Sequence, residues 1–377
     1  MENDAPLRWW RRLHIVPPDH LGTGRRALLL GLLAWLPIAG WALAEGRAFG
    51  GDGEPLIVHY GIHARCLVVI PLLVFAELPL HFICQTTARR FVTSGVVTEM
   101  VRADFDRVLI AVIGARDASL PWVFAFGAAI AWTIADPPAT HGDELAWSMS
   151  RDGTLGFGGA WFAYVSRPIL IALLVGWLWR LWLVTYWMWR IGRLSLTLTP
   201  THPDRSGGIA FTCNLPAGFV LVTLALSAMF ASSWAHQILH HGATLASYEL
   251  PALAYALGWS LLLLMPLFAV APALWVTRWN TLPRYAALAE SQARVVDGCW
   301  IGKQQIAADD PLLEPKGLGV MADVGAVYET VAHMRWLPVG KETLVAIALP
   351  MAIPFALLAL ASMPLAEILS LLFSALK

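Results

Sequence analysis

Residues 161–187 read WFAYVSRPILIALLVGWLWRLWLVTYW, which is an almost uninterrupted apolar run. Arg167 and Arg180 are its only charged side chains. The stretch is longer than the roughly 20 apolar residues that a helix needs to cross a bilayer. Its length and composition therefore predict a transmembrane helix rather than a buried helix of a soluble domain.

Similar apolar runs recur along the rest of the chain. They cover 27–44, 64–84, 120–135, 217–239, 250–276 and 344–376. A long charged segment precedes 27–44, which favours a retained first helix over a cleaved signal peptide. The last run contains Pro350, Pro354 and Pro364, and it is too long for one upright helix but short for two full spans. We predict an all-α, polytopic transmembrane bundle of six full spans, followed by a proline-interrupted C-terminal helix or a re-entrant pair.

The composition supports an integral membrane protein. Hydrophobic residues make up 58% of the 377 residues and charged residues 14%, against about 45–50% and 25% in soluble domains. Basic and acidic residues balance at 26 each, which excludes the basic excess of a nucleic-acid binder. The four cysteines lack C-x-x-C spacing, so we expect each to pack as a small hydrophobic residue. We therefore expect the lipid bilayer, and no nucleic acid, as a partner.

The distribution of basic residues predicts the orientation. With the N-terminus placed inside, the inner segments hold 20 Lys and Arg residues, whereas the outer loops hold only Arg47 and Arg151. Because cytoplasmic loops carry an excess of Lys and Arg, we predict a cytoplasmic N-terminus.

This orientation divides the chain into four regions. They are a cytoplasmic segment at 1–26, a six-helix membrane region at 27–278, a cytoplasmic helical region at 279–341 and a C-terminal membrane segment at 342–377. Within the second region, 86–118 is expected to form an amphipathic helix lying at the membrane face, and 193–215 a cytoplasmic loop.

That cytoplasmic loop contains a compact polar motif. It reads Thr201, His202, Pro203, Asp204, Arg205, Ser206, Gly207, Gly208. One interpretation is a rigid turn, in which proline fixes φ, Asp204 caps the next segment and the two glycines allow positive φ. The other is an anion-contacting loop, in which His202 and Arg205 donate beside the glycine amides.

The same motif resembles a group of bacterial multi-pass inner-membrane proteins. Members carry a Thr-His-Pro-Asp-x-x-Gly-Gly cytoplasmic loop and a late Met-Arg-x-x-Pro segment, which here is Met334-Arg335-Trp336-Leu337-Pro338. The group has no established activity. The resemblance therefore implies a place in the bacterial inner (plasma) membrane and no mechanism.

Ionisable residues inside the predicted spans are the first candidates for a functional site. They are Glu77, His81, Arg167 and Arg180. Charges in a membrane are costly and by default mark a functional site, here the lining of a pore or substrate site. The rise of about 1.5 Å per residue places Glu77 and Arg180 at comparable depth, where an ion pair would serve either helix packing or such a site.

Histidines at the predicted outer face are the second candidates. His59 and His63 are spaced i, i+4, and so are His236 and His240. On a helix this spacing places both rings on one face, as a metal or haem site requires. The alternative is a set of interfacial histidines without a metal.

Three functions fit these patterns. The first is an oligomeric ion or small-solute channel or transporter that uses the charged residues in the spans. The second is a non-catalytic membrane component that docks a cytoplasmic partner. The third is a membrane metal or haem redox protein that uses the outer histidines. We predict no catalytic residue, because no hydrolase motif or nucleophile–base pattern is present.

Overall fold

The computed structural model describes residues 11, 22–50, 54–135, 145–149, 154–298 and 316–363. Within these ranges the regular structure is helical, apart from one isolated bridge between Met149 and Leu155. Seven helical segments are long and apolar enough to cross a membrane. The predicted all-α polytopic fold is confirmed, and the chain is a multi-pass integral membrane protein.

The described residues form twelve α-helices. They are α2 (Thr23–Ala44), α3 (Tyr60–Ala64), α4 (Ile70–Phe75), α5 (Glu77–Thr93), α6 (Glu99–Asp117), α7 (Leu120–Ala135), α9 (Phe157–Trp161), α10 (Arg167–Ile191), α11 (Val220–His240), α12 (Glu249–Val296), α13 (Lys316–Ala332) and α14 (Lys341–Ser362). Two π-helical turns, Arg65–Val69 and Phe162–Ser166, join α3 to α4 and α9 to α10. A 3₁₀ segment, Ala210–Phe219, leads into α11.

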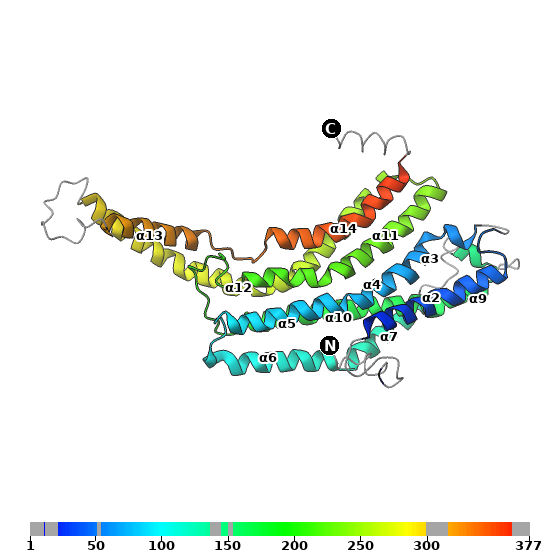
Figure 1. Cartoon of the computed structure of the whole chain (residues 1–377), viewed down its shortest axis with the longest axis horizontal. Coiled ribbons are helices and arrows are strands. Elements are labelled where there is room, and N and C mark those ends of the chain that lie inside the picture. The colour runs from blue at the N-terminus through cyan, green and yellow to red at the C-terminus, as the bar shows by residue number, and fades with distance from the viewer. Residues whose placement is uncertain are drawn as a thin grey trace.

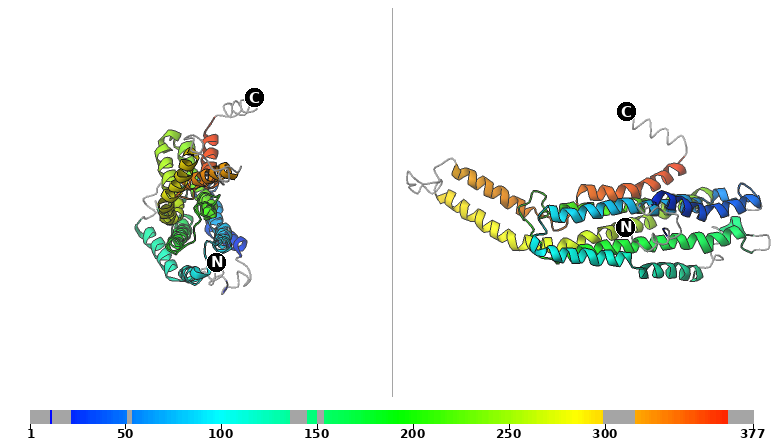
Figure 2. Two further views of the ribbon diagram at one scale, coloured as in Figure 1. Left: turned by 90° about the vertical axis from the view of Figure 1, so that its left-hand side faces the viewer. Right: turned by 60° about the horizontal axis from the view of Figure 1, so that its bottom comes forward.

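These helices form an elongated bundle whose members run along a common long axis (Figure 1). α14 packs along α11, α2 along α4, and α10 contacts both α7 and α12. The second half of α12 and the helix α13 pair as a hairpin that projects beyond one end of the bundle, as Figure 2 also shows.

Helix α6 forms the second half of the predicted amphipathic segment 86–118. Its apolar face is present, because Val101, Phe105 and Val108 recur at helical spacing and are buried. However, α6 packs against α10 along the long axis of the bundle (Figure 1). The buried face of α6 therefore meets a neighbouring helix, and its placement at the membrane face stays a prediction.

The C-terminal apolar run begins as a single helix. α14 continues through Pro350 and Pro354 and packs along α11. The rest of this run, 364–377, lies outside the described residues, and so does most of the predicted segment 1–26.

Prolines inside the spans are accommodated by side chains of neighbouring helices. Pro37 removes the N–H that would bond the Leu33 carbonyl, and the indole Nε1 of Trp161 donates to that oxygen at 3.0 Å. Within a membrane such freed carbonyls must find partners inside the protein. A tryptophan indole also donates to a helix carbonyl near Ala76, where the helix breaks between α4 and α5. Here Trp177 Nε1 donates to the Leu73 carbonyl at 3.0 Å. The break places Glu77 in the first turn of α5.

Candidate functional site

Glu77 lies at the centre of a buried ion-pair cluster that joins α2, α5 and α10. Its Oε2 is 2.7 Å from Arg26 Nη1, and its Oε1 is 2.9 Å from Arg180 Nη2. Arg26 Nη2 also donates to Oε1 at 3.1 Å. All three residues are 4–5% exposed. The expected pair of Glu77 with Arg180 is therefore present, and Arg26 completes it.

This cluster holds three spans together. Both carboxylate oxygens of Glu77 are engaged by guanidinium groups, and Arg180 also lies 4.9 Å from the ring centroid of Trp177. A carboxylate bound in this way is not open to a passing ion, so the geometry favours the helix-packing interpretation. Arg26 was assigned by its sequence to a solvent-facing segment, and only the fold brings it to Glu77.

The other candidates in the spans face two separate cavities. His81 lines one cavity with Arg180, whereas Arg167 lines a second cavity with Arg65. Arg65 donates to Ser233 Oγ at 3.2 Å. The structure therefore does not unite His81, Arg167 and Arg180 in one site.

The loop after α10 is a tightly bonded turn around Asp204. Its carboxylate accepts backbone N–H groups from Ser206 at 2.8 Å, Gly208 at 3.1 Å and Ala210 at 3.0 Å. Burial opposes ionisation, but these three donors outweigh it and lower the pKa of Asp204 below its usual value. His202 Nδ1 lies 2.9 Å from the same carboxylate. The rigid-turn interpretation fits, because Asp204 already takes the amides that an anion would need.

Positive φ angles shape the same turn. Gly207 and Gly208 have φ of 64° and 93°, as the sequence motif predicts, and Arg205 adopts 55°. The carbonyl of Arg205 accepts the N–H of Arg335 at 2.7 Å, and a side chain on Gly207 would meet Met334. The turn at 201–208 and the segment at 334–338 thus contact each other.

The most specific arrangement of chemical groups is a histidine–glutamate cluster, which comprises Glu54, His59, His236 and His241. The side-chain donor atoms of Glu54, His59 and His236 all lie within 4.8 Å of one another. Oε2 of Glu54 is 3.7 Å from His59 Nε2 and 3.5 Å from His236 Nε2, and Oε1 is 3.6 Å from His241 Nε2. His241 Nε2 is 3.3 Å from His236 Nε2.

Two helices and the segments next to them position this cluster. Glu54 and His59 stand immediately before α3, His236 lies in the last turns of α11, and His241 caps that helix. α3 packs against α11, so residues nearly 180 positions apart meet. The rings of His59 and His236 stack with centroids 4.7 Å apart.

The hydrogen bonds around the cluster leave its inward nitrogens available. His236 Nδ1 lies 2.9 Å from the carbonyl of Val58, to which only a protonated Nδ1 can donate, so the lone pair of the neutral imidazole form is on Nε2. Within the described residues, His59 Nε2 and Glu54 Oε2 are buried without a hydrogen-bond partner. Burial and the neighbouring imidazoles lower the pKa of His59 to about 3, which keeps the ring neutral as metal binding requires.

Only one member of each predicted histidine pair belongs to this cluster. His63 instead accepts from Trp35 Nε1 at 2.9 Å, and His240 bonds the hydroxyl of Tyr60 at 3.3 Å. His59 has φ −83° and ψ 69°, outside the helical range, so it does not share a helical face with His63. Glu54 and His241 were not among the candidate residues predicted from the sequence, although the adjacent His240 and His241 at the end of an apolar run were a signal.

Comparison with known protein families, characterised proteins and solved structures finds no match to this chain.

Proposed function

We propose that this protein binds a divalent transition-metal ion at the histidine–glutamate cluster. The observation that carries the proposal is that the donor atoms of Glu54, His59 and His236 all lie within 4.8 Å of one another. The four measured spacings among these residues and His241 are 3.3–3.7 Å. These separations are too long for good hydrogen bonds. They are close to the spacing of about 3.3–3.4 Å that neighbouring donors adopt around a tetrahedral Zn²⁺ with ligands at about 2.0–2.1 Å.

The donor set narrows the choice of metal. Imidazole nitrogens suit Zn²⁺, Cu²⁺, Ni²⁺ and iron, whereas Ca²⁺ and Mg²⁺ prefer all-oxygen sites. Glu54, His59 and His236 supply three donors, and His241, 3.3 Å from His236, is the candidate for a fourth. Glu54 and His241, each about one third exposed, form the solvent-facing side of the cluster. A haem does not fit between His59 and His236, because their rings stack directly on each other.

A bound ion would tie the segment before α3 to the end of α11. In the predicted orientation this is the outer end of the bundle, so the metal would come from outside the cell membrane. Channel or transporter activity stays a sequence-based prediction, because the ion-pair cluster favours helix packing over a pore. Homo-oligomerisation and a cytoplasmic protein partner also stay sequence-based predictions.

The test uses the full-length protein purified in detergent without metal. We expect one Co²⁺ per chain with the intense visible absorption of a tetrahedral site, and displacement of Co²⁺ by Zn²⁺. His236→Ala should weaken Zn²⁺ binding by ~100-fold or more, since even residues that only support a metal ligand contribute about 10–100-fold.

His240→Ala is the matched control. It removes a histidine one turn away on the same helix that bonds Tyr60 rather than the cluster. We expect the His240→Ala variant to bind Zn²⁺ as the wild type does. The proposal fails if the wild type binds neither metal, or if the two variants lose affinity equally.

A further inference from the structure

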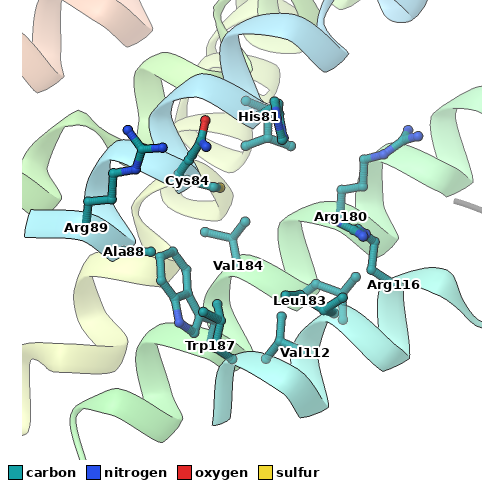
Figure 3. Close-up of a pocket in the computed structure, with 14 residues that line it drawn as sticks. His81, Cys84, Ala88, Arg89, Val112, Arg116, Arg180, Leu183, Val184 and Trp187 are labelled. Carbon is teal, nitrogen blue, oxygen red and sulfur yellow. The ribbon is translucent and has the colours of Figure 1, made fainter. Parts of the chain in front are cut away.

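A second site is an open apolar cavity with cationic groups, lined by residues of α5, α6 and α10 (Figure 3). Its volume is about 360 Å³, within the roughly 300–1,000 Å³ of small-molecule sites. Apolar side chains form most of the wall, including Leu80, Leu109, Val112, Leu183, Val184 and Trp187.

The ionisable groups of the wall carry one sign of charge. Arg89, Arg116 and Arg180 line the cavity together with His81, and among the residues that the structure describes no carboxylate belongs to the lining. In Figure 3, Arg89 lies on one side of the cavity, and Arg116 and Arg180 on the other.

These arginines differ in how they are already engaged. Arg180 binds Glu77, and Arg116 pairs with Asp117 at 2.7 Å. Carboxylates that do not line the cavity therefore neutralise part of the charge of these two arginines. Arg89 is exposed at the surface, where a guanidinium group can meet an anion without being desolvated first.

From this combination we propose that the cavity binds an anionic amphiphile with one acyl chain. The apolar wall takes the chain, and Arg89 at the exposed edge binds the carboxylate or phosphate head. An uncharged chain would leave the guanidinium without an ionic partner, whereas a small hydrophilic anion would leave the apolar wall uncovered. The ligand chemistry is shared by free fatty acids and by single-chain phospholipids.

The binding experiment uses the full chain in nanodiscs of zwitterionic lipid with tritiated palmitate as the probe. Unlabelled competitors distinguish the sources of the chemistry. We expect palmitate and lysophosphatidylglycerol to displace the label, with the stronger competitor identifying the preferred head group. Hexadecanol and acetate should compete at least ~10-fold more weakly, because each lacks either the charge or the chain.

Two pairs of variants locate the site. Arg89→Gln should weaken palmitate binding by about 10-fold, as expected for loss of a charge-assisted contact at an exposed edge. Arg90→Gln, at the neighbouring exposed residue outside the lining, should not. Val112→Trp fills the cavity and should abolish binding, whereas Ile110→Trp, exposed on the same helix, should keep it.

Three results would overturn the proposal. They are hexadecanol competing as strongly as palmitate, equal effects of Arg89→Gln and Arg90→Gln, and unchanged affinity in a folded Val112→Trp variant. The melting temperature of each variant, measured without palmitate, separates loss of binding from loss of folding. None of these variants touches the histidine–glutamate cluster, so the outcome is independent of metal binding.

Discussion

Replacing Glu77 by Gln should destabilise the protein by about 3–5 kcal/mol. The change keeps the shape of the side chain but removes the charge that neutralises Arg26 and Arg180. Both arginines are at most 5% exposed, so neither guanidinium can recover its hydration without local unfolding. Breaking a single buried ion pair costs about 3–5 kcal/mol, and here one carboxylate serves two cations.

The order of the variants tests whether charge is the cause. Arg26→Met leaves the neutral pair of Glu77 with Arg180, so we expect a smaller loss of about 1–2 kcal/mol. The triple variant Arg26→Met/Glu77→Leu/Arg180→Met removes every charge, and it should recover most of the stability lost in Glu77→Gln. Replacing complete buried ion clusters by apolar residues is often neutral or stabilising.

Equilibrium unfolding in mixed micelles with increasing dodecyl sulfate, followed by tryptophan fluorescence, gives the required free energies. The reasoning is refuted if Glu77→Gln lies within 1 kcal/mol of the wild type. It is also refuted if the triple variant is as unstable as Glu77→Gln, because shape rather than charge would then hold the three spans together.

Three further predictions concern the metal and the turn at 201–208. Zn²⁺ at about 100 times its dissociation constant should raise the free energy of unfolding by about 2.7 kcal/mol, and chelator or His59→Ala should abolish this gain in thermal scans. Asp204→Ala should cost about 2–4 kcal/mol at pH 7, because three N–H groups lose a charged acceptor. Folding lowers the pKa of Asp204, so its contribution to the free energy of unfolding is complete above the unfolded pKa of about 3.9. This contribution is lost as the pH falls through the folded pKa. The denaturation curves of the wild type and the Asp204→Ala variant should therefore converge in acid. Gly208→Ala should lower the free energy of unfolding by about 1–2 kcal/mol in the same assay, because φ is 93° and the new methyl group would lie 3.3 Å from Val96. Gly114→Ala, at an open position of α6, is the control and should be neutral or stabilising.

The spans could be predicted because hydropathy is a local property of the chain. Each apolar run outlined a helix of the bundle without knowledge of its neighbours. Depth along the helices was also sufficient to pair Glu77 with Arg180. The contact of Arg26 with Glu77 was not predicted, because a basic residue just before an apolar run is usually an interfacial residue.

The histidine–glutamate cluster shows why helical periodicity alone could not predict the candidate site. The i, i+4 rule holds only if both residues are helical, and His59 stands before α3 with non-helical angles. Glu54 and His241 reach the cluster through the packing of α3 on α11, which no spacing within one segment encodes. For the same reason, the apolar face of α6 was predictable but its partner α10 was not.

The contact between Arg205 and Arg335 also has a consequence for synthesis of the chain. The two residues are separated by 130 positions, with α11, α12 and α13 between them. At about 5–20 residues per second, the ribosome needs roughly 6–26 s to make that stretch. The hydrogen bond between the Arg205 carbonyl and the Arg335 N–H can therefore form only after α11, α12 and α13 have been synthesised.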